Sequence, residues 1–216
     1  MRESQLTGRL RLRHLREVTE AVGEEMSRER SRFHRLARED SAPRAVSAFN
    51  LFQTPEWLAD RMAAIAEIEE GHRVLEPSAG LGRLYQAIRR ACRDRIEVIL
   101  VENSADCCGE LYRFGGGIRL VQADFLECGP DRLGGRFDRI VMNPPFKMGR
   151  DVKHIQHARG LLVPGGRLVA LCANGPRQRE KLQPLADSWE ELPEGSFREE
   201  GTRVNAVLLT MNEAPA

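Results

Sequence analysis

The segment Asn143-Pro144-Pro145-Phe146 has the residue types needed to hold a planar amino group. The Asn143 side-chain oxygen and the Pro144 carbonyl oxygen can each accept one N–H, and Phe146 offers an aromatic face to a flat ring. Two consecutive prolines cannot continue a central strand, because they donate no ladder hydrogen bond. The segment is therefore expected to be a stiff loop. A rigid Asn-Pro turn with no chemistry is the structural alternative.

Such a loop suits methyl transfer to an amine attached to an aromatic ring. The lone pair of this kind of nitrogen is delocalised into the ring, which makes it a poor nucleophile. Accepting both of its N–H groups draws the nitrogen toward tetrahedral geometry and stabilises the positive charge that develops in the reaction. No strong general base is needed, since the product ammonium is acidic. We therefore expect Asn143, Pro144, Pro145 and Phe146 to form a catalytic segment.

A glycine turn precedes this segment in the chain. Residues 76–82 read Glu-Pro-Ser-Ala-Gly-Leu-Gly and follow the apolar pair Val74-Leu75. Glycines directly after a buried strand allow a sharp turn into a helix and a close approach of a ligand to the main chain. The dinucleotide fingerprint is incomplete, because Tyr85 stands where its third glycine would be. An acid four residues before the first glycine, Glu76, favours a cationic or zwitterionic ligand; a simple tight turn is the alternative.

Two further acids follow the next two expected strands. Glu102 ends the second strand about 20 residues beyond the glycines, where a doubly wound sheet would bind a ribose diol. Asp124, followed by Phe125, comes after the third strand. Each acid alone could be an ordinary helix N-cap. Because ligands of open α/β sheets bind outside the carboxyl ends of the strands, three such acids in register with a glycine turn favour a shared binding site.

The elements that must position these residues alternate between helical and strand periodicity, which is typical of a βαβ architecture. The periodicity predicts strands at 72–76, 96–102, 118–122, 137–142, 167–173, 189–192 and 204–211, and helices at 56–69, 81–93, 105–114, 152–162 and 177–188. We expect an α/β fold with a mostly parallel seven-stranded sheet, helices on both faces, and an antiparallel hairpin at the edge formed by the last two strands.

The first 43 residues are predicted to be a helical extension to a domain over 44–216, with the break at Ser41-Ala42-Pro43. The stretch 1–16 contains five arginines against the single acid Glu3. A basic amphipathic helix of this kind could follow a phosphate backbone. The alternative is a solvated helix packed on the domain or on a second subunit. The arginines are Arg2, Arg9, Arg11, Arg13 and Arg16.

Composition limits the class of protein. The chain has 216 residues, 41% of them hydrophobic, and no run approaches the roughly 18 apolar residues of a membrane span. Its first residues lack the apolar core of a signal peptide. Five cysteines without Cys-x-x-Cys spacing argue against a disulfide framework and against zinc, and for reduced, mostly buried thiols. We expect a cytoplasmic protein without a metal site.

The two motifs together resemble those of the class I S-adenosylmethionine (SAM)-dependent amino-methyltransferases, and more closely the N6-adenine DNA methyltransferases. Their Asn/Asp-Pro-Pro-aromatic signature matches 143–146, and their SAM-binding glycine motif matches 76–82. Residues 52–55, Phe-Gln-Thr-Pro, resemble the segment of these enzymes that packs beside SAM. Its place ahead of the glycine motif is similar to the gamma arrangement of the family. The resemblance covers roughly residues 49–211 and implies a Rossmann-like class I methyltransferase fold.

The resemblance also implies a role for each matched residue. Thr54 and Pro55 would border the methionine end of SAM, and Glu102 would hold the ribose hydroxyls. Asp124 would accept from the adenine amine of SAM, with Phe125 beside that ring. The catalytic segment would hold a flipped target base. The residues that match the glycine motif would surround the cofactor: Glu76, Ala79, Gly80 and Gly82.

The substrate and partners stay open at this point. DNA is favoured, but an RNA adenine-N6 methyltransferase would use the same pocket, and a protein glutamine methyltransferase also carries Asn-Pro-Pro, usually followed by Tyr. A non-catalytic SAM-fold subunit that binds nucleic acid is the alternative from another class. Many gamma-type enzymes have a target-recognition domain after the core. Here recognition would come from the N-terminal helices, from 147–153, from 194–202, from a homodimer or from a separate specificity subunit.

Overall fold

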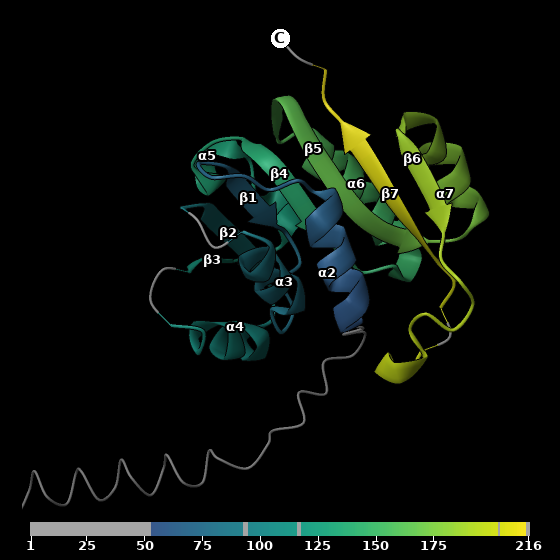
Figure 1. The fold of residues 1–216 in the computed structure, drawn as a ribbon, viewed down its shortest axis with the longest axis horizontal. Helices are drawn as coiled ribbons and strands as arrows, with labels where there is room; N and C mark the ends of the chain where they lie inside the picture. Colours follow the sequence, from purple (N-terminus) through teal and green to yellow (C-terminus); the bar gives the residue numbers. More distant parts are fainter. Residues whose placement is uncertain (1–52, 93–94, 116–117, 203, 215–216) are drawn as a thin grey trace, which may run out of the picture. The chain divides into compact units, whose positions relative to one another are not determined.

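The computed structural model describes residues 53–92, 95–115, 118–202 and 204–214 (Figure 1). The predicted helical extension over 1–43, its basic stretch at 1–16 and the boundary at Pro43 lie outside these residues. The methyl-transfer and glycine motifs lie within them, as do all the strands of the predicted sheet.

Seven strands form one sheet in the order β3-β2-β1-β4-β5-β7-β6. All neighbouring pairs among β1 to β5 are parallel, and β7 runs antiparallel to both β5 and β6. The predicted mostly parallel sheet with an antiparallel hairpin at one edge is thus confirmed. The strands are β1 Arg73–Glu76, β2 Glu97–Glu102, β3 Arg119–Gln122, β4 Phe137–Met142, β5 Leu162–Ala173, β6 Ser188–Glu191 and β7 Ala206–Asn212.

Helices cover both faces of the sheet (Figure 1). Helices α2, α3 and α4 pack on one face, and α5 and α6 pack on the other. The short helix α7 follows β5. The helices are α2 Glu56–Ile65, α3 Arg83–Ala91, α4 Ala105–Tyr112, α5 Pro130–Leu133, α6 Arg150–Arg159 and α7 Pro176–Lys181.

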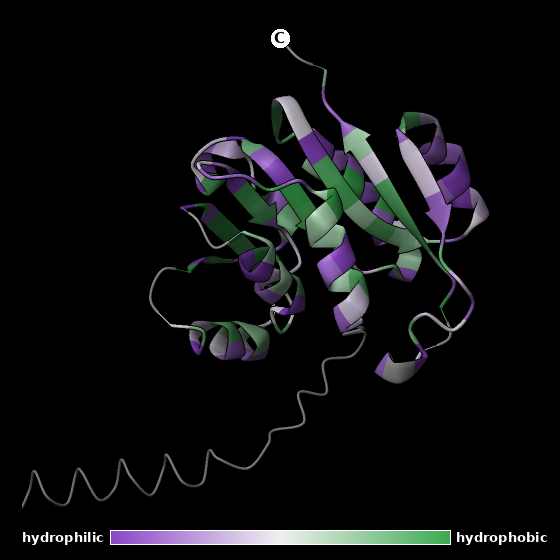
Figure 2. Ribbon diagram, viewed as in Figure 1, coloured by the Kyte–Doolittle hydropathy of each residue, from purple (hydrophilic) through white to green (hydrophobic). Residues whose placement is uncertain are grey.

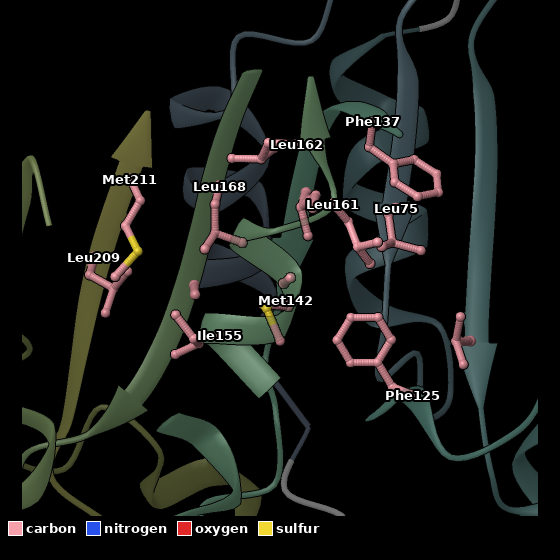
Figure 3. Close-up of a cluster of buried hydrophobic side chains, with 14 of the residues drawn as sticks. Leu75, Phe125, Phe137, Met142, Ile155, Leu161, Leu162, Leu168, Leu209 and Met211 are labelled. Atoms are coloured by element: carbon pink, nitrogen blue, oxygen red, sulfur yellow. The ribbon is translucent and has the colours of Figure 1, made fainter. Parts of the chain in front are cut away.

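The alternation of side chains along the strands divides the core into two clusters. In β4, Ile140 and Met142 belong to the cluster under α6, whereas Val141 belongs to the cluster under α2 and α3. Figure 2 shows these central strands as mostly hydrophobic, with a few hydrophilic interruptions, as expected for a parallel sheet covered on both faces. In Figure 3, Phe125 lies at the end of the α6 cluster toward which the parallel strands point. The core therefore reaches to the rim where the strands end.

Several element boundaries differ from the prediction. Helix α2 ends at Ile65 instead of residue 69, and the chain turns at Glu67, which has a φ of 49°. Strand β5 begins at Leu162, five residues before the predicted start. Its pairing with β4 is irregular there, because Phe137 pairs with Leu162 and Arg139 with Arg167, which leaves Pro164-Gly165-Gly166 out of the register. Helix α7 ends at Lys181, and a 3-10 turn over Gln183–Leu185 replaces the rest of the predicted helix, since Pro184 cannot donate a helical hydrogen bond.

All five cysteines are buried and unpaired, as the sequence predicted. Within the described ranges, no helix has the length and apolar character that a membrane crossing requires. Over the same ranges, no three His, Cys, Asp or Glu side chains are grouped so that they could hold a metal ion.

Candidate active site

One pocket of about 510 Å³ lies where the parallel strands end. Its wall includes the last residues of β1 and β2, Glu76 and Glu102, together with Asp124 two residues after β3 and Asn143 directly after β4. The four strand ends lie side by side because β3, β2, β1 and β4 are neighbours in the sheet. The structure therefore brings the three predicted acids and the Asn-Pro-Pro-Phe segment to a single cavity.

Glu102 anchors the glycine turn. Its carboxylate accepts the backbone N–H of Gly80 at 2.8 Å and those of Asn103 and Ser104 at 2.9 and 2.8 Å. Gly80 has a φ of 52°, a conformation that glycine adopts without strain. The contact joins the turn after β1 to the end of β2 and fixes one side of the pocket.

Glu76 is the most deeply buried acid of the pocket wall, with 1% of its surface exposed. Its Oε2 atom is buried and has no hydrogen-bond partner among the residues that the structure describes. Burial first, and then the negative charge of Glu102, raises the pKa of Glu76 well above its usual value, although a backbone hydrogen bond from Tyr85 acts in the opposite direction. Since a buried carboxyl oxygen without a donor is costly, this atom favours a ligand that brings a donor or a positive charge.

Asp124 has partners that the sequence did not reveal. Its Oδ1 accepts the N–H of Leu126 at 3.1 Å, and its Oδ2 pairs with Arg150 Nη2 at 2.9 Å. Burial acts to raise the pKa of Asp124, but the Leu126 N–H and Arg150 outweigh it and lower the pKa below its ordinary value. A carboxylate can accept about four hydrogen bonds, so Asp124 keeps the capacity to bind an amine.

His154, on α6, also belongs to the pocket. It is 3% exposed, and its Nδ1 lies 3.5 Å from the Ser78 hydroxyl of the glycine turn. Burial first, and then the charge of Arg150, lowers the pKa of His154 to about 4, so the ring is neutral at pH 7. His157, half-buried on the same helix, lies 2.9 Å from the Cys128 carbonyl and stacks edge-on against Phe125.

The signal that identifies His154 is its spacing. His154 lies three residues after Asp151 and four residues before Ala158, and Ile155 lies between them at the complementary spacing, so all four share one helix face, and all four are buried. Asp151 is held by the N–H groups of Val152 and Ala173 and by Gln178, which explains how a carboxylate can lie inside the core.

Thr54 contacts the Asn143 side chain. The Asn143 Nδ2 group donates to Thr54 Oγ1 at 3.2 Å, and Thr54 is 3% exposed. Because the amide is planar, this contact turns Oδ1 away from Thr54 and restricts rotation of the group. Both residues line the pocket. Thr54 therefore positions the amide of the predicted catalytic segment.

We expect Thr54→Val to slow turnover about 3- to 10-fold, the range set by the loss of one ordinary hydrogen bond. Valine keeps the shape of threonine but gives Asn143 no acceptor. The effect should fall on kcat more than on SAM affinity, and Thr54→Ser should restore the rate. Steady-state kinetics with both substrates varied would test this. A loss confined to the KM for SAM would instead assign Thr54 to cofactor binding alone.

The remaining predicted residues divide into two groups. Ala79, Phe125, Pro144, Pro145 and Phe146 line the pocket. Pro55 and Gly82 do not. The Pro55 carbonyl accepts the first N–H groups of α2, from Leu58 and Ala59. Gly82 is the N-cap of α3 and has a φ of 80°, a backbone conformation that favours glycine, and a Cβ there would lie 2.7 Å from the Phe114 ring.

Residues 56–195 match the methyltransferase small domain family. The chain belongs to this family. Methyltransferases in general use SAM as their methyl donor. The residues of the pocket fit that donor: a positively charged group of SAM could meet the Glu76 oxygen that has no partner among the described residues, and the volume lies within the range of about 300–1,000 Å³ found for small-molecule sites.

Solved structures share the methyltransferase fold. TrmN from Thermus thermophilus is 21% identical with a TM-score of 0.60, and the match covers 73% of this chain and 48% of TrmN. A type I restriction-modification system methyltransferase subunit from Streptococcus thermophilus is 19% identical with a TM-score of 0.64, covering 75% of this chain and 45% of that one. This chain thus spans about half the length of each.

The same fold also occurs with another chemistry. The [4+2]-cyclase SpnF is 17% identical with a TM-score of 0.56, and the match covers 74% of this chain and 81% of SpnF. Fold alone therefore does not define the reaction, and the substrate must be argued from the pocket.

Proposed function

We propose that this methyltransferase transfers the SAM methyl group to an exocyclic amino group, with N6 of adenine in DNA as the target. The observation that carries the proposal is the position of the Asn143 amide, oriented by Thr54, in the same pocket as the unpartnered carboxyl oxygen of Glu76. A cation-binding end and an amine-binding end share one cavity, as an in-line transfer between two ligands requires.

The cofactor end of the pocket consists of the strand-end acids and the glycine turn. Glu76 would face the positively charged part of SAM, and Glu102 the ribose hydroxyls. Asp124 would accept from the adenine amine, with Phe125 beside that ring. SAM supplies an electrophilic methyl group on a good leaving group. The protein residues then have only to bind and orient the two substrates.

The acceptor end consists of the segment after β4. Asn143 Oδ1 and the Pro144 carbonyl would each accept one N–H of the target amine, while Phe146 packs against its ring. Among the described residues, no intramolecular donor reaches the Pro144 carbonyl, which supports its use by a ligand. The hydrogen bonds to both acceptors become stronger as the nitrogen gains positive charge, so they stabilise the transition state more than the bound substrate.

Two observations support DNA as the substrate. Lys147, directly after Phe146, and Lys153, on α6, are exposed and can pair with phosphates. A structural neighbour is a methyltransferase subunit of a restriction-modification system. Target recognition would come from a second copy of the chain or from a specificity subunit, because the pocket itself reads only the amine.

Transfer of labelled methyl from SAM to duplex DNA, single-stranded DNA, rRNA and a protein extract, assayed in parallel, tests the proposal. Label in DNA that is lost in Asn143→Ala supports it. Label only in rRNA or only in protein would show that DNA is not the substrate, while the proposed methyl transfer to an amino group would still stand. SAM binding without transfer to any acceptor would indicate that a partner subunit is missing, whereas no binding at millimolar SAM would indicate a non-catalytic subunit.

A further inference from the structure

An exposed methionine lies at the mouth of the pocket. Met148 lines the pocket and is 84% exposed, the highest value among the large hydrophobic side chains of the described residues. Single exposed apolar residues are common on protein surfaces. Met148 differs from the others in that it lines the pocket, where it can contact a bound ligand. Met148 is therefore a candidate contact for a ligand larger than the pocket.

Met148 is also held in an unfavourable backbone conformation. Its φ of 58° and ψ of 23° lie in the left-handed region, which costs free energy for any residue with a Cβ. Both flanks of the loop are anchored. Phe146 packs against the core and its carbonyl accepts the Gly149 N–H at 3.2 Å, while Arg150 pairs with Asp124. The loop thus presents an apolar side chain to solvent at a cost to stability, which is typical of functional sites.

The surroundings of Met148 are positively charged. Lys147 and Lys153 are exposed, and Arg177 is exposed and packs beside Gly149. In the described part of the chain, none of these three cations has an acid within 4.0 Å. Residues 146–157 contain one acidic residue, Asp151, which is fully buried and hydrogen-bonded within the core. An apolar tip among unpaired cations is complementary to stacked bases between phosphates.

We propose that Met148 is a wedge that enters the base stack of duplex DNA when the target adenine leaves it. This inference rests on the proposed function. An amine inside a duplex cannot reach Asn143 at the wall of the pocket, so the base must be extruded. Extrusion leaves a gap beside the pocket mouth, and a flexible apolar side chain can fill that gap. The neighbouring cations would hold the phosphates on either side.

The wedge can be tested with Met148→Gly and Met148→Leu on one unmethylated DNA, assayed as duplex and after heat denaturation. Glycine removes the side chain and relieves the left-handed strain, so its unfolding midpoint should rise by about 2–4 °C. We expect its ratio of duplex to single-strand methylation rates to fall about 10-fold, since extrusion from a duplex lacks its replacement contact. Leucine keeps an apolar side chain and should keep the wild-type ratio.

Three outcomes would overturn the wedge. An unchanged ratio in Met148→Gly would show that the side chain does not act on duplex opening. An equal loss of rate on both DNA forms, together with weaker SAM binding, would make Met148 a cover for the cofactor. A wild-type protein that labels rRNA or protein but neither form of DNA would overturn the proposed substrate, and the wedge with it.

Discussion

Asn143→Ala should lower the rate of methyl transfer by about 100- to 1,000-fold, the effect of removing one preorganised partner of a developing charge. The Asn143 side chain lines the pocket and is oriented by Thr54. Its loss leaves the target amine with the Pro144 carbonyl alone. The SAM dissociation constant should change little, because Asn143 is not among the predicted cofactor contacts. Single-turnover rates and a SAM titration would measure the two effects separately.

Two further variants sharpen this prediction. Asn143→Asp keeps acceptor oxygens, and the Thr54 hydroxyl can donate to a carboxylate, so it should retain more activity than the alanine variant. Asn212→Ala is a matched control, because Asn212 ends β7 and its side chain accepts from Arg167 outside the pocket. Equal loss in Asn212→Ala, or weak SAM binding in Asn143→Ala, would contradict the assigned role.

Glu76→Gln is expected to weaken SAM binding by about 10- to 100-fold, as for the loss of a charge-assisted hydrogen bond. Because the pKa of Glu76 is raised, the affinity for SAM should depend on pH. A cationic ligand favours the ionised carboxyl, so wild-type affinity for SAM should increase as the pH rises toward and through the pKa of Glu76. The glutamine variant has no such group and should show no increase. Calorimetric titrations at several pH values would detect the difference.

The same substitution should stabilise the protein without SAM. The pKa of Glu76 is raised in the folded state, so the unfolded chain releases this proton first, from about pH 4.3 upward. Wild-type stability therefore falls relative to Glu76→Gln as the pH rises from that point through the folded pKa. Thermal unfolding at pH 5 and pH 8 should show a larger advantage of the variant at pH 8. A variant that is less stable at both values would contradict the buried, unpartnered carboxyl.

Asp151→Asn provides the contrast. Asp151 is as deeply buried as Glu76, but its carboxylate has three donors and does not line the pocket. An asparagine would set an NH2 group against N–H donors, so it should lower the unfolding midpoint. It should leave the pH dependence of SAM affinity as in the wild type. The pair of variants separates a ligand-binding carboxyl from a structural one.

The sequence predicted which residues meet in the pocket, because neighbouring parallel strands all end at the same edge of the sheet. Once βαβ alternation fixes the strands, residues that directly follow them must meet at one edge. Glu76, Glu102, Asp124 and Asn143 could be grouped on this basis without knowledge of any contact. The antiparallel pair at the edge was predictable for a similar reason, since two short strands joined by a turn-rich stretch favour a hairpin.

Contacts that depend on how elements pack could not be predicted in the same way. The Arg150–Asp124 pair and the contact of His154 with Ser78 depend on the rotation of α6 over the sheet, which the sequence does not specify. The Thr54–Asn143 hydrogen bond joins residues 89 positions apart. The early end of α2 depends on Glu67 in a left-handed conformation, where neither glycine nor proline marks the turn.

The central claim is most directly tested by identifying the methylated nucleoside. Unmethylated duplex DNA would be incubated with the protein and with SAM that carries a deuterated methyl group, then digested and analysed by mass spectrometry. We predict the label in N6-methyladenine with the wild type, and at most about one-hundredth of it with Asn143→Ala. Label in another nucleoside, or equal label from the Asn143→Ala variant, would contradict the account.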